Sequence, residues 1–350
     1  MTIYTSSDGF LTKYFVYTSG EYIDVAQAEV NALSRPLALD EISWEERVGL
    51  IDSSTNPVSF LLERAALVKE AGIILGEIEE LDAIETNLSD DVLKSSISAE
   101  ETFSVRVISL TDRKKDRERK EIETKLGEHI RKITNASVSL NSPESRILVF
   151  KFRNTILVCK SSASQLRHDL RNREPGKKPF FHPSMMNAPL ARVMCNLAGV
   201  MPGEIVLDPF CGGGGILCEA SFIGAKTVGI DLNWRLLMGA MKNLAAIGNH
   251  HTFIQGDIRT LPIRECDCIV TDPPYGRSSS TRGAYAIHLV ESLLGNIDSV
   301  LRRRGESLCI CGSSEMNIQK IANNYGLKVS QMLQIKVHSG LVRNILTIKF

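Results

Sequence analysis

The sequence lacks the features that mark membrane-spanning, secreted and zinc-binding proteins. Its longest apolar runs fall well short of the ~18 residues that a membrane-spanning helix needs. The first residues hold no basic segment followed by an apolar one, so no signal peptide is predicted. Although there are 8 Cys, no C-x-x-C and no Cys/His cluster with zinc-ligand spacing occurs. We therefore expect a cytoplasmic globular protein that binds no metal and buries its cysteines as small hydrophobic residues.

Two nucleotide-binding motifs are also absent. The run from Gly212 to Gly215 begins like the dinucleotide-binding motif G-x-G-x-x-G, but Leu217 stands where the third glycine belongs. No G-x-x-x-x-G-K-[ST] occurs either, which excludes a P-loop. A nucleoside cofactor without a pyrophosphate group therefore fits this glycine run better than a dinucleotide does.

The chain has no net charge, with 41 Lys and Arg against 41 Asp and Glu, but the charge is unevenly distributed. Residues 1–105 carry 6 basic and 20 acidic residues, a net of −14, whereas residues 106–192 carry 20 and 9, a net of +11. Residues 193–350 carry the remaining 15 and 12, a net of +3. The basic middle segment indicates either a surface that binds a polyanion or a solvated charged face, and charge alone favours neither.

The first half of the chain is predicted to form two smaller α+β parts, over residues 1–50 and 51–160. Asp24 is the expected N-cap of the first helix, and Gly72 is expected to end the second. Hydrophobic periodicity predicts helices over 24–33 and 58–69, and a third that follows the basic run 113–120 and continues through Arg131. The predicted strands cover 13–17, 103–108, 137–140, 146–150 and 155–159. Residues 161–180 are basic and rich in turn-forming residues, which favours a linker.

From residue 181 onward, strands and helices alternate regularly, which predicts a doubly wound, Rossmann-like α/β sheet. Two closing segments, 328–337 and 344–349, are expected to pair as an antiparallel hairpin. The other expected strands cover 205–207, 227–230, 252–254, 268–270 and 307–310, and the expected helices cover 189–199, 215–222, 233–247, 284–303 and 317–324.

Two short stretches, Asp208–Gly215 and Asp272–Gly276, each directly follow a predicted buried strand. A glycine-rich turn from a strand into a helix lets backbone amides approach a ligand closely. The Asp-Pro-Pro turn is stiff, because two prolines fix φ. Since open α/β sheets bind ligands at the carboxyl edge of their strands, we predict a cofactor loop at the first stretch and a substrate loop at the second.

Carboxylates follow four successive strands of the predicted sheet, at Asp208, Asp231, Asp257 and Asp272. Asp231 lies 23 residues after Asp208, a spacing at which a carboxylate accepts hydrogen bonds from a ribose. The cationic sulfonium of S-adenosylmethionine suits such an acidic crevice. S-adenosylmethionine is therefore the predicted cofactor.

The Asp-Pro-Pro-Tyr stretch suits transfer of a methyl group to an exocyclic amine of a base. Such an amine is a poor nucleophile, because its lone pair is delocalised into the ring. The Asp272 carboxylate and the Pro273 carbonyl are the expected acceptors of its hydrogen bonds, and Tyr275 offers a face for stacking. Catalysis is then mostly positioning for in-line transfer. The alternative for Asp-Pro-Pro-Tyr is a rigid surface turn without catalytic function.

These stretches resemble the amino-methyltransferases with a class I Rossmann-like fold. The whole chain resembles, more specifically, the THUMP-domain tRNA guanosine-N2-methyltransferases that modify guanosine 10. Asp208-Pro-Phe-Cys-Gly-Gly-Gly-Gly resembles the glycine loop of that family, and Asp272-Pro-Pro-Tyr-Gly-Arg-Ser-Ser resembles its substrate loop. Pro179-Phe-Phe-His-Pro-Ser and Pro189-Leu-Ala-Arg resemble the segment that precedes the glycine loop and helps to cover the cofactor. Residues 1–160 resemble the family only in pattern and charge.

The resemblance implies an enzyme that uses S-adenosylmethionine to methylate N2 of guanosine in tRNA, once or twice. It implies a ferredoxin-like unit over 1–50, a THUMP-like RNA-binding module over 51–160, a basic linker over 161–180 and a methyltransferase domain over 181–350. It also implies a monomeric catalytic chain without membrane association, and a small zinc-binding activator protein as a partner.

The implied catalytic residues are Asp272, Pro273 and Tyr275. The implied cofactor-binding residues are His182, Asp208, Cys211, Gly212, Gly214, Asp231, Leu232, Asp257 and Ile258. The expected RNA-binding residues are Arg113, Lys114, Lys115, Arg117, Arg171, Arg173, Lys177, Lys178 and Arg277.

Two other functions stay open at this point. DNA amino-methyltransferases share the shorter Asp-Pro-Pro-Tyr motif, but such an enzyme is expected to carry a target-recognition insertion in its catalytic half, and none is visible here. An RNA-binding protein that has kept the fold and lost the activity is the second alternative. The intact Asp231, Asp257 and Asp272 argue against it.

Overall fold

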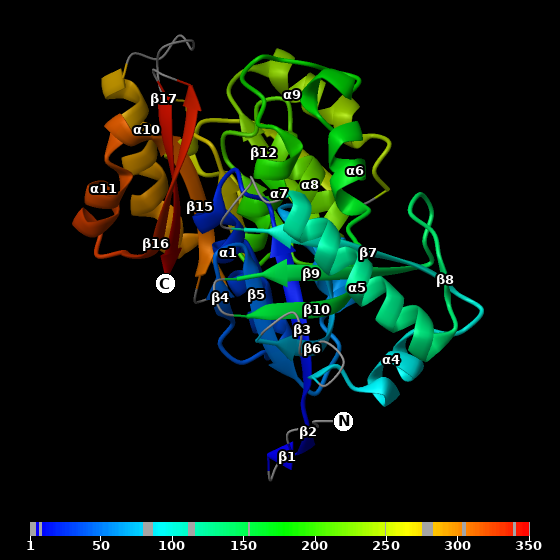
Figure 1. The fold of residues 1–350 in the computed structure, drawn as a ribbon. Helices are drawn as coiled ribbons and strands as arrows, with labels where there is room; N and C mark the ends of the chain where they lie inside the picture. Colours follow the sequence, from blue (N-terminus) through cyan, green and yellow to red (C-terminus); the bar gives the residue numbers. More distant parts are fainter. Residues whose placement is uncertain are drawn as a thin grey trace. The chain divides into compact units, whose positions relative to one another are not determined.

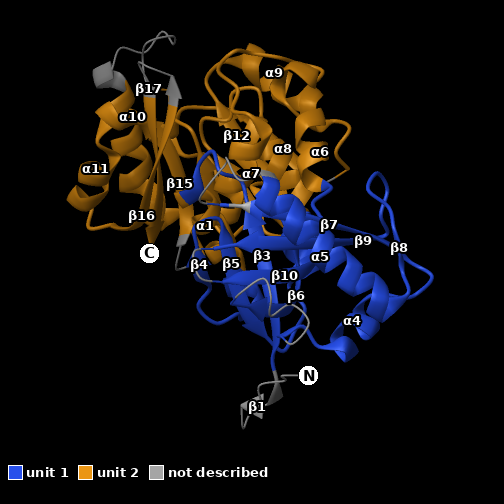
Figure 2. Ribbon diagram, in the orientation of Figure 1, with its two compact units in different colours: residues 1–23, 34–63, 68–165 blue, residues 24–33, 64–67, 166–350 orange. Residues whose placement is uncertain are grey.

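The computed structural model describes residues 5–6, 9–79, 87–110, 116–152, 155–248, 250–274, 283–302, 306–338 and 341–349. The chain divides into two compact units, shown in two colours in Figure 2. Unit 1 comprises residues 1–23, 34–63 and 68–165, and unit 2 comprises residues 24–33, 64–67 and 166–350. Across the described ranges, no helix combines the length and the apolar character that crossing a membrane requires.

Unit 1 is built on an eight-stranded sheet with the strand order β4-β5-β3-β6-β10-β9-β7-β8. Strand β7 runs parallel to β8 and β9, and the other neighbours are antiparallel. The strands are β3 (Thr12–Thr18), β4 (Ser43–Glu45), β5 (Val48–Ser53), β6 (Val68–Ile78), β7 (Thr102–Ser109), β8 (Ser137–Val138), β9 (Ser145–Lys151) and β10 (Ile156–Ala163). A separate short hairpin, β1 (Thr5–Ser6) and β2 (Gly9–Phe10), precedes them.

Helices α4 (Asp90–Ser96) and α5 (Asp116–Thr134) bury their apolar faces in the core of unit 1. Ile122, Leu126 and Ile130 of α5 are each at most 1% exposed, which confirms the helical spacing predicted for this segment. A second hydrophobic cluster of unit 1 includes side chains of β9, and in it the rings of Phe15 and Phe150 lie 5.3 Å apart.

Three sequence-based expectations for the first half of the chain were wrong. The helix after Pro57, α2 (Val58–Arg64), ends at Arg64 instead of Lys69, because residues 68–78 form β6 between β3 and β10. Gly72 therefore ends no helix. It lies within β6, where an added Cβ would stand 2.0 Å from the carbonyl oxygen of Lys160, so only glycine fits between the strands. The N-cap of α1 (Ile23–Ser34) is Tyr22, and Asp24 lies inside the first turn.

The strand pairing and the segment after it also differ from the expected boundaries. Residues 12–53 and 68–163 share one sheet, so the boundary expected near residue 50 has no counterpart in the strand pairing. The expected linker contains helix α6 (Leu166–Asn172) and a 3-10 turn, Pro175–Lys177. Leu166 and Leu170 bury one side of α6, and the whole segment belongs to unit 2.

Unit 2 contains a seven-stranded sheet with the order β13-β12-β11-β14-β15-β17-β16. Its strands are β11 (Ile205–Asp208), β12 (Lys226–Asp231), β13 (His251–Gln255), β14 (Cys268–Thr271), β15 (Glu306–Ser313), β16 (Lys328–His338) and β17 (Leu341–Lys349). The first five are parallel, and β17 is antiparallel to β15 and β16. The predicted α/β fold class and the closing hairpin are thus confirmed.

Helices cover both faces of this sheet (Figure 1). Helices α7 (Ala188–Leu197), α8 (Gly215–Ile223) and α9 (Trp234–Leu244) lie on one face, and α10 (Gly283–Asn296) and α11 (Ile318–Asn324) on the other. Helix α10 ends earlier than the predicted residue 303. The reason is that Cys266 pairs with Leu301 and accepts a hydrogen bond from Arg302, which draws the chain out of the helix.

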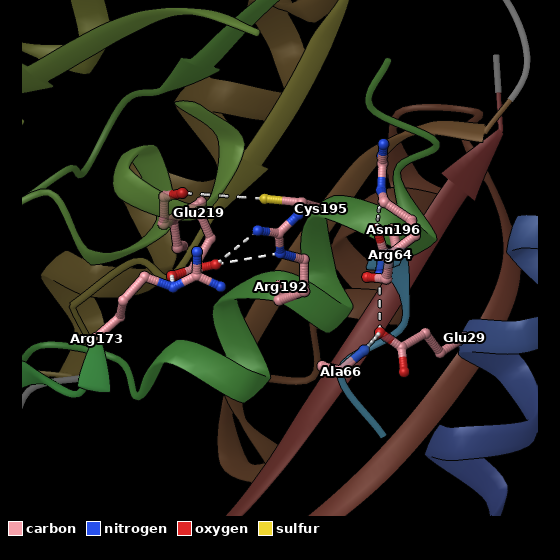
Figure 3. Close-up of polar contacts among 9 residues, drawn as sticks. Glu29, Arg64, Ala66, Arg173, Arg192, Cys195, Asn196 and Glu219 are labelled. Atoms are coloured by element: carbon pink, nitrogen blue, oxygen red, sulfur yellow. Dashed lines mark hydrogen bonds and ion pairs between the residues drawn. The ribbon is translucent and has the colours of Figure 1, made fainter. Parts of the chain in front are cut away.

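A buried polar cluster explains why two N-terminal segments belong to unit 2 (Figure 3). The carboxylate of Glu29 accepts hydrogen bonds from the amides of Ala66, at 2.8 Å, and Leu67, at 2.9 Å. Asn196 of α7 donates to Glu29 at 2.8 Å, and its Oδ1 accepts from Nε of Arg64 at 2.7 Å. Burial raises the pKa of Glu29, and these hydrogen bonds counteract that rise. The cluster thus ties α1 and residues 64–67 to α7.

Candidate active site

The glycine loop and the Asp-Pro-Pro turn lie on neighbouring strands. They follow β11 and β14, which pair in parallel at the point where the strand order reverses. The side chain of Thr271, the last residue of β14, donates a 2.7 Å hydrogen bond to Oδ1 of Asp208, the last residue of β11. This bond joins the two predicted loops at their origin. A topological switch point of this kind is where open α/β sheets bind ligands.

The glycine loop owes its shape to two left-handed residues. Gly212 has φ +51° and Gly214 has φ +76°, conformations that favour glycine. The amide of Gly212 donates to Oδ2 of Asp231 at 2.9 Å, which connects the loop to the end of β12. A Cβ added at Gly212 would meet nothing within 4 Å, so this turn of the loop faces open space.

Asp231 is held by the backbone on both of its carboxylate oxygens. The amide of Gly212 donates to its Oδ2, and the amide of Asn233 donates to its Oδ1 at 2.7 Å. Burial raises the pKa of Asp231, and the two backbone hydrogen bonds act in the opposite direction. Two exposed apolar side chains follow it, Leu232 at 53% and Trp234 at 50% exposure. A carboxylate beside exposed apolar side chains suits a ribose and an adenine.

Asp208 lies beneath the loop and is 2% exposed. Its Oδ1 accepts from Thr271 and from the amide of Phe210, at 3.2 Å. Burial raises the pKa of Asp208 to about 7, and the nearby carboxylates of Asp272 and Asp231 push it in the same direction. The site thus gathers negative charge at the junction of β11, β12 and β14.

The segment before α7 is fixed onto the glycine loop by Asn243 of α9. The Asn243 side chain accepts from the Phe180 amide at 2.8 Å, and it donates to the carbonyls of Phe180, at 3.0 Å, and Gly213, at 2.9 Å. The Phe180 ring fills a slot beside α9, since a Cβ added at Gly239 would stand 2.2 Å from it. We call this segment, residues 179–184, the strap. It contains His182, whose Nδ1 lies 2.7 Å from the hydroxyl of Ser184.

Two further predicted cofactor residues are found near β13, and one in the glycine loop. Asp257 follows β13, and its carboxylate is engaged by the side chain and the amide of Arg259, which lower its pKa. Ile258 is 3% exposed and packs into the core. Cys211 is 5% exposed, and its side chain lies among Leu217 and other apolar residues.

The predicted catalytic Asp272 lies one residue beyond β14, with a side chain that is 13% exposed. Nη1 of Arg343, in β17, lies 3.7 Å from its Oδ2. Pro273 is buried beside it. Tyr275 and Arg277 lie outside the described residues.

The predicted RNA-binding residues fall into three groups. Arg113, Lys114 and Lys115 lie outside the described residues. The side chains of Arg117, Arg171 and Lys177 are exposed. Arg173 and Lys178 are turned inward, toward Glu219, at 3.3 Å, and Cys218 respectively.

Arg173 takes part in a second buried ion-pair cluster (Figure 3). Glu219 of α8 is fully buried between Arg173 and Arg192, whose Nη2 lies 3.0 Å away. Arg173 also lies over the ring of Phe222, 4.1 Å from its centroid. These contacts favour a structural role for Arg173 over contact with a phosphate.

Thr271, Asn243 and Arg343 were not identified from the sequence. Asn243 contacts a residue 63 positions earlier, and Arg343 contacts one 71 positions earlier. The one local sign was that Thr271 directly precedes the Asp-Pro-Pro motif.

The described residues fit S-adenosylmethionine. Gly212 leaves open space in the loop, Asp231 presents a carboxylate that is fixed by backbone amides, and Leu232 and Trp234 are exposed beside it. The carboxylates of Asp208, Asp231 and Asp272 match a cationic sulfonium.

Three features define a Rossmann-like methyltransferase: the strand order, the glycine loop after β11 and the Asp-Pro-Pro turn after β14. Residues 175–345 match the family described as RMKL-like, methyltransferase domain. The tRNA (guanine(10)-N2)-dimethyltransferase of Methanothermobacter thermautotrophicus is 30% identical over 340 residues, which cover 95% of this chain and 98% of that protein. The enzyme of the same name from Methanocaldococcus jannaschii is 27% identical, over 93% and 97%.

The fold is also shared with a solved structure. The crystal structure of TrmN from Thermus thermophilus matches with a TM-score of 0.58 at 18% identity, over 96% of this chain and 99% of that one. From the relative in Methanothermobacter, the chain belongs to the family of the tRNA (guanine(10)-N2)-dimethyltransferases.

Proposed function

We propose that this protein transfers methyl groups from S-adenosylmethionine to N2 of guanosine 10 in tRNA, giving the dimethylated base in two rounds. The observation that carries the proposal is the 2.7 Å bond from Thr271 to Asp208, which joins a glycine loop to an Asp-Pro-Pro turn at the switch point of the sheet. The names of the full-length relatives in two archaea support the choice of atom, base and position.

The residues around the glycine loop are proposed to bind the cofactor. S-adenosylmethionine supplies an electrophilic methyl group on a cationic sulfonium. Gly212 and Gly214 let the loop backbone approach the cofactor, and Asp231 accepts hydrogen bonds from its ribose. Asp208, buried below the loop, adds negative charge under the sulfonium.

The other predicted contacts surround these residues. Leu232 lies against the adenine, and the residues after β13 supply its polar contacts: the carboxylate of Asp257, once Arg259 turns away, and the backbone of Ile258. Cys211 contributes its backbone, and His182 closes the site from the strap.

Asp272 and Pro273 are proposed to orient the target amine. The Asp272 carboxylate and the Pro273 carbonyl accept hydrogen bonds from the N2 amine, which directs its lone pair toward the methyl group. Tyr275 stacks on the guanine. The base must leave the RNA helix to reach this edge of the sheet, as in other enzymes that modify bases.

The basic residues are proposed to bind the phosphates of tRNA. Of those that the structure describes, Arg117, Arg171 and Lys177 are exposed and are retained here, together with the undescribed Arg113, Lys114, Lys115 and Arg277. Phosphate contacts give affinity without selecting sequence. Residues 51–160 keep the proposed role of a THUMP-like RNA-binding module.

The same resemblance supports a monomeric catalytic chain that works in the cytoplasm, where tRNA is processed, with a small zinc-binding activator protein. Size-exclusion chromatography with light scattering tests the monomer. Activity of the purified chain alone would remove the need for an activator.

The test is methyl transfer from labelled S-adenosylmethionine to an unmodified tRNA transcript, followed by nucleoside analysis. We expect N2-methylguanosine and then N2,N2-dimethylguanosine, and no product with a matched transcript that carries adenosine at position 10. Asp272→Ala should abolish transfer while cofactor binding, measured by calorimetry, persists. Transfer to DNA oligonucleotides and none to tRNA would refute the substrate and leave the fold unaffected.

Charge reversal tests the RNA contacts. The triple variant Arg117→Glu, Arg171→Glu and Lys177→Glu should bind tRNA more weakly and with a shallower dependence on salt. Lys320→Glu, on the exposed side of α11, is the control for charge reversal at a position outside the predicted RNA-binding residues. If the triple variant and the control bind tRNA with equal affinity, these residues form a solvated charged surface and do not contact tRNA.

A further inference from the structure

Arg343 lies at the carboxyl edge of the parallel strands although it comes from the end of the chain. Because β17 is antiparallel to β15, with Arg343 opposite Ser313, its first residues reach the edge at which β14 ends. Thr271 of β14 in turn pairs with Ile310 of β15. The antiparallel closing strand thus brings a guanidinium to the edge at which Asp208, Asp231 and Asp272 lie.

The contact between Arg343 and Asp272 is an ion pair rather than a hydrogen bond. Nη1 and Oδ2 are 3.7 Å apart, and both side chains are largely buried, at 18% and 13% exposure. At this distance the guanidinium attracts the carboxylate strongly in a partly desolvated site. A carboxylate offers about four acceptor positions, so the ion pair with Arg343 does not use up the hydrogen-bonding capacity of Asp272.

Two other groups interact with the Asp272 carboxylate. The carboxylate of Asp208 interacts with it electrostatically from the end of β11, and like charges disfavour ionisation. From β15, the thiol of Cys311 donates a hydrogen bond to Asp272, which favours the ionised form. Among the described residues, Arg343 places a positive charge against this carboxylate.

We infer that Arg343 is a positioning residue of the methyl transfer, which keeps Asp272 ionised and aimed at the target amine. This inference rests on the role proposed above for Asp272. A protonated carboxyl group keeps one acceptor oxygen but turns the other into a donor and loses its charge, so the ionised form is the stronger acceptor. Arg343 supplies the opposite charge that favours this form beside Asp208.

The other end of β14 offers a matched control. Asp267, just before the strand, pairs with Arg302, whose Nη2 lies 3.0 Å from its Oδ1. The same carboxylate accepts from the amide of Ile205, at the start of β11. One Asp–Arg pair therefore flanks each end of the strand, and only the pair at the carboxyl edge adjoins the predicted site.

The experiment compares Arg343→Gln, Arg343→Lys and Arg302→Gln with the wild type. Single-turnover transfer is measured from pH 5.5 to 9 with saturating cofactor. For Arg343→Gln we expect the acid limb of the rate profile to move up by about one pH unit, with about tenfold loss on that limb and recovery at high pH. Arg343→Lys should restore most of the rate, and Arg302→Gln should keep the wild-type profile.

A second measurement does not depend on activity. The side-chain carboxyl resonances of ¹³C-labelled aspartate are titrated, and the signal of Asp272 is identified by its absence from Asp272→Asn. In Arg343→Gln this signal should titrate at a higher pH than in the wild type. Arg343→Ala is the second variant, should the glutamine variant fail to fold.

The outcomes separate this inference from the proposed function. If the wild type makes no N2-methylguanosine, the proposed function fails, while the titration of Asp272 still decides the effect of Arg343. If the Asp272 signal titrates identically in both proteins, or if Arg343→Gln lowers the rate equally at every pH, the inference about Arg343 is wrong.

Discussion

Replacing Asp208 by Asn should stabilise the protein at alkaline pH. Asp208 is 2% exposed, and both of its hydrogen bonds, from Thr271 and from the amide of Phe210, go to Oδ1. An Asn side chain keeps that oxygen as an acceptor and removes the charge. Asp208→Asn is therefore a close isostere that isolates the effect of ionisation.

The magnitude follows from the pKa of Asp208, which is raised from 3.8 to about 7 by burial. The folded protein binds this proton more tightly than the unfolded chain, so stability is highest below the unfolded value and falls as the pH rises toward 7. At about 1.4 kcal/mol per pH unit, Asp208 lowers stability relative to a neutral side chain by about 4 kcal/mol at pH 8, where it is ionised in the folded protein. At pH 5, where folding must protonate it, the loss is about 1.5 kcal/mol. The advantage of the Asn variant should therefore grow by about 2.5 kcal/mol across this range.

The assay is urea denaturation of the wild type and Asp208→Asn at four pH values from 5 to 8. Asp52→Asn, at an exposed position of β5, controls for the loss of one carboxylate elsewhere. The stabilised variant should also bind S-adenosylmethionine more weakly, because negative charge under the sulfonium is lost. A difference in unfolding free energy that stays constant between pH 5 and pH 8 would refute the reasoning.

Three further variants test contacts described above. Asn243→Ala removes the bonds that fix Phe180 to the glycine loop, and we expect about tenfold weaker cofactor binding by calorimetry; unchanged affinity would show that the strap holds without them. Gly239→Ala would place a methyl group against the Phe180 ring and should lower the free energy of unfolding by about 1–3 kcal/mol, measured in urea, whereas no loss would mean that the ring moves freely. Asn196→Ala takes a partner from buried Glu29, which should cost about 2–3 kcal/mol; a smaller loss in urea denaturation would indicate that water replaces the amide.

The sequence predicted unit 2 well, because its elements follow simple local rules. Short apolar runs, which form the strands, alternate with segments of helical periodicity. Glycines mark the turns between them, such as Gly199 and Gly224, both with positive φ. The same rules failed after Arg64. Ala65-Ala66-Leu67 suits a helix, but the hydrogen-bonding edges of β3 and β10 make the following residues a strand, and pairing of that range is not encoded locally.

The site was predictable only in part, for a related reason. Asp208, Asp231 and Asp272 follow strands, so topology alone brings them to one edge. Asn243 and Arg343 contact residues far away in the sequence, and each carries a side chain that is common on surfaces. Arg173 shows the converse case. It stands in a basic run, yet its guanidinium contacts buried Glu219, and charge counting cannot tell these two situations apart.

The burial of the cysteines makes this chain convenient for labelling. All eight thiols are buried and none is paired in a disulfide, so the folded protein should react slowly with maleimides. Cysteines introduced at exposed positions such as Arg117 or Lys177 would then carry fluorophores or crosslinkers without removal of the native thiols. The path of a bound tRNA over each unit becomes accessible to distance measurements in an otherwise unaltered enzyme.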